Sequence, residues 1–298
     1  MSGPAPATRG LQALLLGTAA VWGANLSVVK LLLVQMEPLL VSVLRMLVAA
    51  VAVAAVVAWR RMPWPQLSRR QWGALAGCAF LMVYINQIFF VHGVAGTNAA
   101  NAALIIALNP LVSSLLAVVL LGDRLSPPRI LGVALGFGGV AAVVLHRPGM
   151  ALGGAGLGDL LVLCSVTTWV LGGVMVQRLA RGIDPLFISA VLNVIGTALL
   201  LLHVGLRPSP LVYDASRING MTVVLIGVSG LLATALGGIV WNRALMVLGV
   251  ARTALYSYWV PIFGVLFAVL LLGEPLTVWH GVGLAAVLAG TWLGTRSH

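Results

Sequence analysis

The most constraining feature of this sequence is a succession of long apolar runs separated by short polar breaks. A helix needs about 20 apolar residues to cross the hydrocarbon core of a bilayer. Only 8% of the 298 residues are charged and 61% are hydrophobic, whereas about a quarter of the residues in soluble domains are charged. We therefore predict an all-α membrane protein with ten transmembrane helices and no room for a soluble catalytic domain. The predicted helices span residues 11–34, 38–58, 71–91, 97–120, 128–145, 159–180, 185–204, 219–241, 250–272 and 277–294.

The basic residues predict the orientation of the chain in the membrane. With the N-terminus placed in the cytoplasm, the outer segments hold only Arg147, Arg207 and Arg217, while Lys30 and Arg45 lie within predicted spans. Cytoplasmic loops carry an excess of Lys and Arg, so we predict that both termini are cytoplasmic. Lipid head groups, rather than nucleic acid, then account for the net charge of +11. The remaining twelve cations fall in cytoplasmic segments: Arg9, Arg60, Arg61, Arg69, Arg70, Arg124, Arg129, Arg178, Arg181, Arg243, Arg252 and Arg296.

The two halves of the chain resemble each other, which indicates an internal repeat. We predict one five-helix repeat over residues 1–148 and a second over residues 149–298. Because five is an odd number, the second copy enters the membrane from the opposite side, so the repeats are inverted. In secondary transporters of this design the substrate site lies near the midplane, between the repeats. Offsets of 147 to 151 residues align Trp22 with Trp169, Pro38 with Pro185, Pro110 with Pro261, Gly122 with Gly273, and Asp123 with Glu274.

Polar and aromatic residues within the predicted spans are the candidate substrate ligands. Polar groups are costly in hydrocarbon, so they face a cavity or another helix. A ring three residues from an amide or a second ring shares one helix face with it, and so does a ring two steps of four away, as with Trp169 and Gln177. Rings suit an amino-acid side chain and amides suit its ammonium and carboxylate groups, although ordinary helix packing explains each pair equally well. The predicted substrate-binding residues are Trp22, Asn25, Tyr84, Gln87, Trp169, Gln177, Tyr256 and Trp259. Other polar residues at membrane depth are Asn86, Asn109, Thr167, Thr168, Asn193 and Ser257.

Two prolines and an arginine are also predicted at membrane depth. Pro110 and Pro261 each remove the hydrogen bond to the carbonyl four residues earlier, at Ile106 and Ser257. We expect the prolines to kink their helices, and binding of an ammonium group by the freed carbonyls is the alternative. An arginine at a helix centre costs about 2.5–3.5 kcal/mol on insertion scales. Arg45 therefore either pairs with a carbonyl or a helix dipole, or faces a water-filled path.

Several short motifs occur in a characteristic order along the chain. They are Trp22-Gly23-Ala24-Asn25, Arg45 after Pro38, Leu121-Gly122-Asp123-Arg124-Leu125, Gly158-Asp159-Leu160, and Leu272-Gly273-Glu274-Pro275-Leu276. This order resembles the drug/metabolite transporter superfamily, in its ten-helix EamA-like branch, over nearly the whole chain. Within that branch the chain is most similar to the YddG-type bacterial exporters of aromatic and other neutral amino acids. The family usually has Glu where this chain has Asp123. The resemblance implies a multi-pass protein of a bacterial inner membrane that exports amino acids.

The residues and the resemblance together predict a transporter and not an enzyme. The histidines lie at span ends or in loops, and none belongs to a metal-ligand or catalytic motif, so we expect no catalytic residue, metal or cofactor. The six acidic residues also lie at span ends, which leaves no group at membrane depth to carry a proton. We predict a facilitator that exports aromatic or large neutral amino acids, or similar small metabolites, by alternating access. A proton-coupled exporter of cationic drugs or other metabolites is the alternative, and the oligomeric state, monomer included, is left open.

Overall fold

The computed structural model describes residues 6–121, 127–146, 155–179, 183–248, 253 and 255–295. Within these ranges the chain forms six helices long and apolar enough to span a bilayer and four shorter apolar helices. This confirms the prediction of an all-α protein with ten membrane-spanning helices. The predicted repeat boundary at residues 148 and 149, the motif around Asp123 and the predicted start of the ninth span lie outside the described residues.

The helices follow the same order in both halves of the chain. The first half contains α1 (Pro6–Leu33), α2 (Pro38–Trp59), α3 (Arg69–Ala79), η1 (Phe80–Ile85), α4 (Asn86–Gly96), α5 (Ala99–Ile106), α6 (Asn109–Leu121) and α7 (Pro127–Leu145). The second half contains α8 (Ala155–Leu179), α9 (Pro185–Gly205), η2 (Ala215–Arg217), α10 (Gly220–Val228), η3 (Ser229–Leu236), α11 (Gly237–Leu248), η4 (Leu255–Tyr258), α13 (Trp259–Leu272) and α14 (Val278–Thr295). The short loops leave the helix faces as the main packing surfaces.

The third span of each half contains a π-helical segment, which the sequence analysis did not predict. Segment η1 joins α3 to α4, and segment η3 joins α10 to α11. Both spans contain the π segment within their predicted range but run past their predicted ends at residues 91 and 241, to Gly96 in one half and to Leu248 in the other. Single π turns within α-helices occur frequently at functional sites.

The fourth span of the first half is interrupted, whereas the sequence predicted one continuous helix over residues 97–120. Helix α5 ends at Ile106, and α6 begins three residues later, at Asn109, directly before Pro110. The backbone N–H of Leu108 bonds the carbonyl of Ile105 at 3.0 Å, which is a tighter turn than an α-helix. Pro110 has no N–H to donate, so the ladder stops here. In the second half, the 3-10 segment η4 precedes α13 and Pro261 at the corresponding place.

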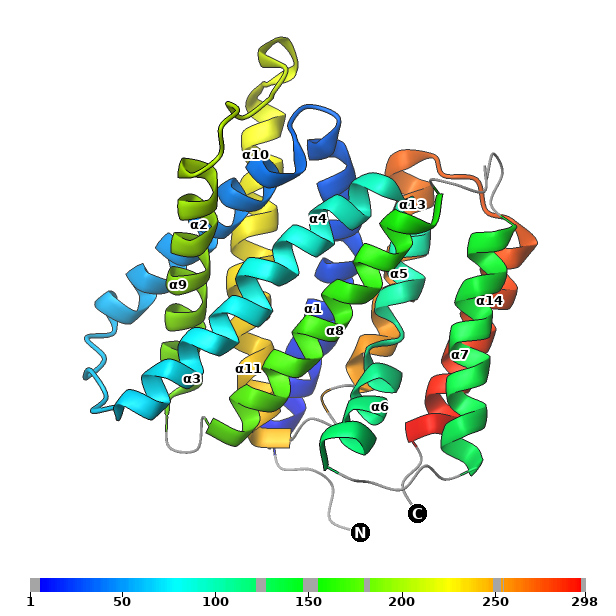
Figure 1. The fold of residues 1–298 in the computed structure, drawn as a ribbon, viewed down its shortest axis with the longest axis horizontal. Coiled ribbons are helices and arrows are strands. Elements are labelled where there is room, and N and C mark those ends of the chain that lie inside the picture. Colours follow the sequence, from blue (N-terminus) through cyan, green and yellow to red (C-terminus); the bar gives the residue numbers. More distant parts are fainter. Residues whose placement is uncertain are drawn as a thin grey trace.

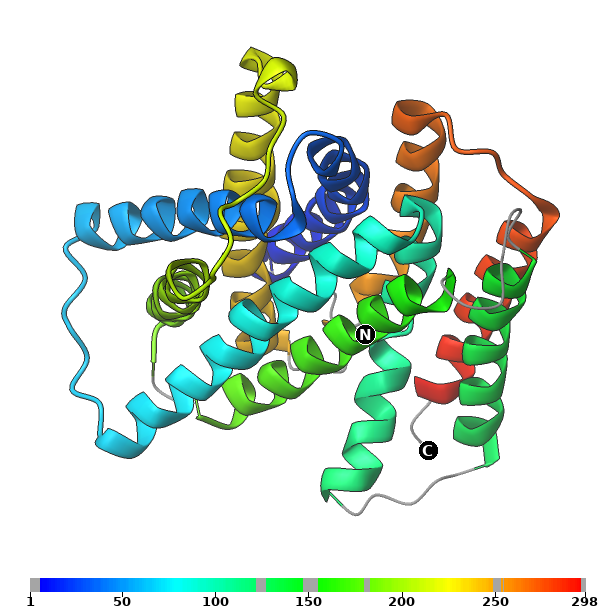
Figure 2. The same ribbon diagram turned by 45° about the horizontal axis from the view of Figure 1, so that its top comes forward.

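The two halves pack against each other reciprocally (Figures 1 and 2). Helix α1 packs against α11 and α13, while α8 packs against the equivalent elements of the other half, α4, α5 and α6. Helices α2 and α9 are repeat partners and contact each other, as do α7 and α14. This is the relation expected of two inverted five-helix repeats. The start of α1 and the end of α14 lie at the same end of the bundle.

Helices α7 and α14 form a separate layer beside the other spans (Figure 2). A Cβ atom on Gly290 would lie 2.6 Å from the carbonyl oxygen of Gly132 and 2.6 Å from the backbone nitrogen of Gly136. Only glycine permits this close approach of the two helix backbones, a recurrent device between transmembrane helices. Helices α7 and α14 therefore pack mainly against each other, and the other spans enclose the centre of the bundle.

Candidate substrate cavity

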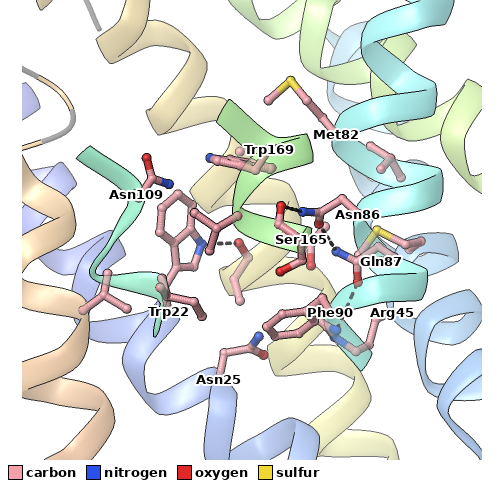
Figure 3. Close-up of a pocket in the computed structure, with 18 of the residues that line it drawn as sticks. Trp22, Asn25, Arg45, Met82, Asn86, Gln87, Phe90, Asn109, Ser165 and Trp169 are labelled. Carbon is pink, nitrogen blue, oxygen red and sulfur yellow. Dashed lines mark hydrogen bonds between the residues drawn. The ribbon is translucent and has the colours of Figure 1, made fainter. Parts of the chain in front are cut away.

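A cavity of about 170 Å³ lies at the centre of the bundle, between the two repeats (Figure 3). A cavity of about 150 Å³ is large enough to hold a benzene molecule, so this one suits a small metabolite. Its polar lining residues are Asn25, Arg45, Asn86, Gln87, Asn109, Ser165, Asn193, Thr234, Asn242 and Ser257. Its other lining residues are Trp22, Leu26, Met46, Met82, Val83, Phe90, Ile106, Val166, Trp169, Leu192, Ala233, Gly238 and Val260. The first four spans of both repeats contribute to it, including both π segments and the interrupted helix.

Two repeat-related tryptophans form one wall of the cavity. The rings of Trp22 and Trp169 meet edge to face, with centroids 6.0 Å apart and an interplanar angle of 90°. Trp241 lies behind them, with its ring centroid 5.2 Å from that of Trp22 and 6.4 Å from that of Trp169. The indole Nε1 of Trp22 donates a hydrogen bond to the carbonyl oxygen of Ala233 in η3, at 2.8 Å. This bond fixes the orientation of the ring, so the aromatic wall is preformed.

The opposite wall contains Arg45, which is only 2% exposed (Figure 3). Its Nε donates to the hydroxyl oxygen of Ser229, and its Nη1 donates to Oε1 of Gln87 at 3.4 Å. The guanidinium carbon also lies 5.7 Å from the ring centroid of Phe90, within the range of a cation–π contact. Arg45 therefore lines the cavity and bonds side-chain oxygens, whereas one of the expected alternatives was a bond to a carbonyl or a helix dipole.

A chain of amide and hydroxyl groups surrounds this arginine. The Ser229 hydroxyl donates to Oδ1 of Asn25 in α1. On the other side, Nε2 of Gln87 donates to Oδ1 of Asn86 at 3.3 Å, and Nδ2 of Asn86 donates to the carbonyl oxygen of Ser165 in α8 at 2.7 Å. The network thereby connects α1, α2, α4, α8 and the start of η3, and it holds the guanidinium from two sides.

Two further amides line the cavity with one oxygen each unpaired. The Nδ2 atoms of Asn193 and Asn242 both bond Ser189, at 2.8 Å to its carbonyl oxygen and at 2.8 Å to its hydroxyl oxygen, respectively. The Oδ1 atoms of both asparagines are buried and have no hydrogen-bond partner among the described residues. A buried acceptor without a partner costs about 1–3 kcal/mol.

The structure brings together half of the eight residues predicted to bind substrate. Trp22, Asn25, Gln87 and Trp169 line the cavity. The other four lie elsewhere: Tyr84 bonds Nδ1 of His203 through its hydroxyl at 3.0 Å, Gln177 is exposed, Tyr256 packs on the cluster around Leu11 and Trp241, and Trp259 is 45% exposed. The predicted kink prolines border the cavity through their neighbours Ile106, Asn109, Ser257 and Val260.

The placement of Tyr84 has a physical reason in the π segment η1. A π turn holds more residues than an α turn, so the three-residue spacing between Tyr84 and Gln87 does not put both side chains on one face. The cavity instead receives Met82 and Val83 from η1 and Asn86 and Gln87 from α4. Asn242 was not among the predicted polar residues because the predicted span ended at residue 241, whereas the helix continues to Leu248.

The acidic residues in the described part of the chain are engaged at helix ends, away from the cavity. Asp184 caps α9 by accepting from the N–H of Leu186 at 2.8 Å, and Glu274 accepts from the N–H groups of Ala99 and Ala100 at 2.8 and 3.1 Å. Asp159 accepts a bond from Thr97 at 2.5 Å. No Asp, Glu or His lines the cavity, and no cluster of metal-ligating side chains occurs, among the described residues.

The remaining acids of the described chain, Glu37 and Asp214, lie at the end of the bundle opposite the chain termini. Glu37 pairs with Arg207, and the hydrogen bond from Arg207 to Glu37 raises the pKa of the guanidinium. Asp214 pairs with Arg217 at 2.9 Å, and hydrogen bonds from Ser216, followed by the charge of Arg217, lower the pKa of the Asp214 carboxyl. A short antiparallel bridge pairs Met36 with Tyr213 between the same two loops. The Glu37–Arg207 pair and the bridge connect the α1–α2 loop to the α9–α10 loop, whereas Asp214 and Arg217 pair within the α9–α10 loop.

Comparison with known proteins shows similarity over the whole bundle. The chain is 31% identical over 218 residues to the Bacillus subtilis protein named "Uncharacterized transporter YyaM", covering 69% of this chain and 67% of that protein. It is 27% identical over 288 residues to the Escherichia coli protein named "Probable amino-acid metabolite efflux pump", covering 92% of this chain and 90% of that protein. A crystal structure of a protein at 18% identity shares the fold, with a TM-score of 0.70 over 96% of this chain and 98% of the other.

Comparison with models of protein families identifies the family of this chain. The model of the EamA-like transporter family matches the chain twice, over residues 11–145 and 156–296, that is, once in each half. Two matches in one chain agree with the reciprocal packing of the two halves and with the central cavity between them. The chain therefore belongs to the EamA-like transporter family and is a multi-pass membrane transporter of small molecules.

Proposed function

We propose that this protein exports amino acids, aromatic or large neutral ones first, or similar small metabolites, across a bacterial inner membrane. The observation that carries the proposal is the composition of the central cavity, where two tryptophan rings face a buried network of amides and one guanidinium. A zwitterion with an apolar side chain has groups that match both walls. The similarity to a probable amino-acid metabolite efflux pump supports the same substrate class.

The proposed mechanism is alternating access by movement of one repeat against the other. The cavity lies at the interface of the repeats and is bordered by the interruption at Pro110 and by both π segments. Such irregular backbone in a membrane is tolerated where it lines a cavity. We place both termini in the cytoplasm, because the cytoplasmic segments then carry most of the arginines.

The proposed energy source is the gradient of the substrate itself. A proton-coupled carrier needs a titratable group that is exposed in turn to each side of the membrane, and in a bilayer this is usually Asp, Glu or His. The described lining of the cavity contains none of these. The same fact weighs against the alternative, a proton-coupled exporter of cationic drugs, because a cation in this cavity would meet Arg45 and no carboxylate.

Uptake of labelled L-phenylalanine and L-leucine into liposomes containing the purified protein tests the proposal. We expect transport that equilibrates but does not accumulate, with or without an imposed pH gradient. Trp169→Ala should reduce it at least tenfold, whereas Trp259→Ala, the same change at an exposed position on α13, should leave it intact. Accumulation that a protonophore abolishes would refute the facilitator mechanism, and absence of transport for a full panel of neutral amino acids would refute the substrate class.

A further inference from the structure

We infer that Arg45 is the carboxylate-binding residue of the central cavity, and that the molecules this protein carries are those with a carboxylate group. The inference deepens the proposed function and rests on it for the direction of movement, but it concerns the chemistry of one subsite. Its starting point is a charged side chain that is buried at membrane depth, lines the cavity and has no acidic partner there.

The hydrogen bonds of Arg45 leave part of the guanidinium unused. Nε is taken by Ser229 and one N–H of Nη1 by Gln87, while Nη2 has no partner among the described residues. A guanidinium presents its N–H groups as a planar fork that matches the two oxygens of a carboxylate. Hydrogen bonds between such a fork and a carboxylate are shorter and about twice as strong as bonds between neutral groups.

The surroundings of Arg45 supply dipoles but no counter-charge. Its contacts are the hydroxyl oxygen of Ser229, the amide oxygen of Gln87 and the ring of Phe90. The acids in the described chain are occupied at helix ends. A buried charge without a counter-ion is unfavourable, and an anion that enters the cavity supplies what is missing. The cavity is thus electrostatically prepared for an anionic group.

The number of cations in the cavity selects the kind of anion. Arg45 is the only basic residue among the described residues that line it. One guanidinium balances the single charge of a carboxylate but not the higher charge of a phosphate monoester. The amide oxygens of Asn193 and Asn242 are uncharged and buried beneath the cavity surface, so nothing in them requires an ammonium group. The carboxylate is therefore the essential group, and the amino group is the additional one.

The decisive experiment uses two ligands that differ only in charge, 3-phenylpropionate and 3-phenylpropionamide. Binding to the purified protein is measured by thermal shift and by tryptophan fluorescence. We expect the carboxylate to bind at least tenfold more tightly than the amide to the natural protein. The ratio should fall to about one in Arg45→Gln, should be partly kept in Arg45→Lys, and should be unchanged in Arg207→Gln, which removes a guanidinium at the bundle end.

Each outcome decides for or against the inference. Equal binding of the two ligands to the natural protein, binding of neither, or a preference that persists in Arg45→Gln would overturn it. If Arg45→Gln does not fold, the natural protein and Arg45→Lys still give the answer. An Arg45-dependent preference without amino-acid transport in liposomes would keep the inference and reject the proposed substrates. Amino-acid transport with no such preference would do the reverse.

Discussion

The indole Nε1 of Trp22 in the first repeat donates to the carbonyl oxygen of Ala233, in the π segment of the second repeat, at 2.8 Å. This bond joins the aromatic wall of the cavity to η3, the segment that also provides Ser229 to Arg45. The two walls of the site therefore share one irregular stretch of backbone. A movement of η3 would reach both the ring and the guanidinium.

The first prediction compares the two tryptophans of the aromatic wall. Trp22→Phe keeps a ring but removes the bond to Ala233, which should destabilise the protein by about 1 kcal/mol. Trp169→Phe removes no indole hydrogen bond found in the described structure, so it is the matched control. Thermal unfolding of the purified variants measures the difference. Equal losses in both variants would show that the bond contributes nothing.

The second prediction introduces an acid into the cavity. Asn242→Asp is nearly isosteric and places a titratable carboxyl where the described lining has none. We expect slower transport of neutral amino acids at neutral pH, because the new charge competes for Arg45, and recovery as the pH falls and the carboxyl is protonated. Initial rates in liposomes at several pH values measure this. Asn219→Asp, at the cap of α10 outside the cavity, should leave the pH profile flat.

The third prediction concerns the ion pair between the two loops opposite the termini. The side chains of Glu37 and Arg207 are 17% and 23% exposed, so solvent screens the pair only in part. A double-mutant cycle with Glu37→Gln and Arg207→Gln should give a favourable coupling free energy. The more exposed pair of Asp214 and Arg217 should give less than half of that. A larger coupling free energy for the more exposed pair would contradict this prediction.

The fourth prediction concerns Glu274, which caps the start of α5. Glu274, from the Leu272–Leu276 motif, accepts two backbone N–H bonds at the start of α5. Glu274→Ala should lower the free energy of unfolding by about 1 kcal/mol, the usual cost of a lost cap. Glu274→Gln should lower the free energy of unfolding by a smaller amount. One amide oxygen still accepts a hydrogen bond, although the favourable negative charge at the helix start is lost. An unfolding series in a mild denaturant separates the three proteins.

The sequence predicts the number and the repeat of the helices because both are recorded in local patterns. Apolar length defines the spans, and paired residues such as Trp22 and Trp169 define the repeat. Trp22 and Trp169 also proved to face each other, since residues equivalent under the repeat lie on either side of its interface.

The rest of the site depends on features without a local signal. The π segments shift the facing side chains, so Tyr84 turns to His203 while Asn86 and Gln87 reach the cavity. Gln177 shares a helix face with Trp169, but it lies two turns further along α8, beyond the cavity. The surroundings of Arg45 depend on where η3 crosses α2, which the sequence does not indicate. Gly230 permits the close crossing, because a Cβ atom there would lie 2.9 Å from the carbonyl oxygen of Arg45.

The matching positions of η1 and η3 bear on the history of the chain. The two π segments begin at Phe80 and Ser229, and they occupy the third span of each half. A π segment arises when one residue is inserted into an α-helix, and two independent insertions at equivalent sites require two events. A single insertion into a five-helix ancestor, followed by duplication and fusion of its gene, requires one. One insertion that predates the duplication is therefore the most economical origin of the irregular backbone beside the cavity.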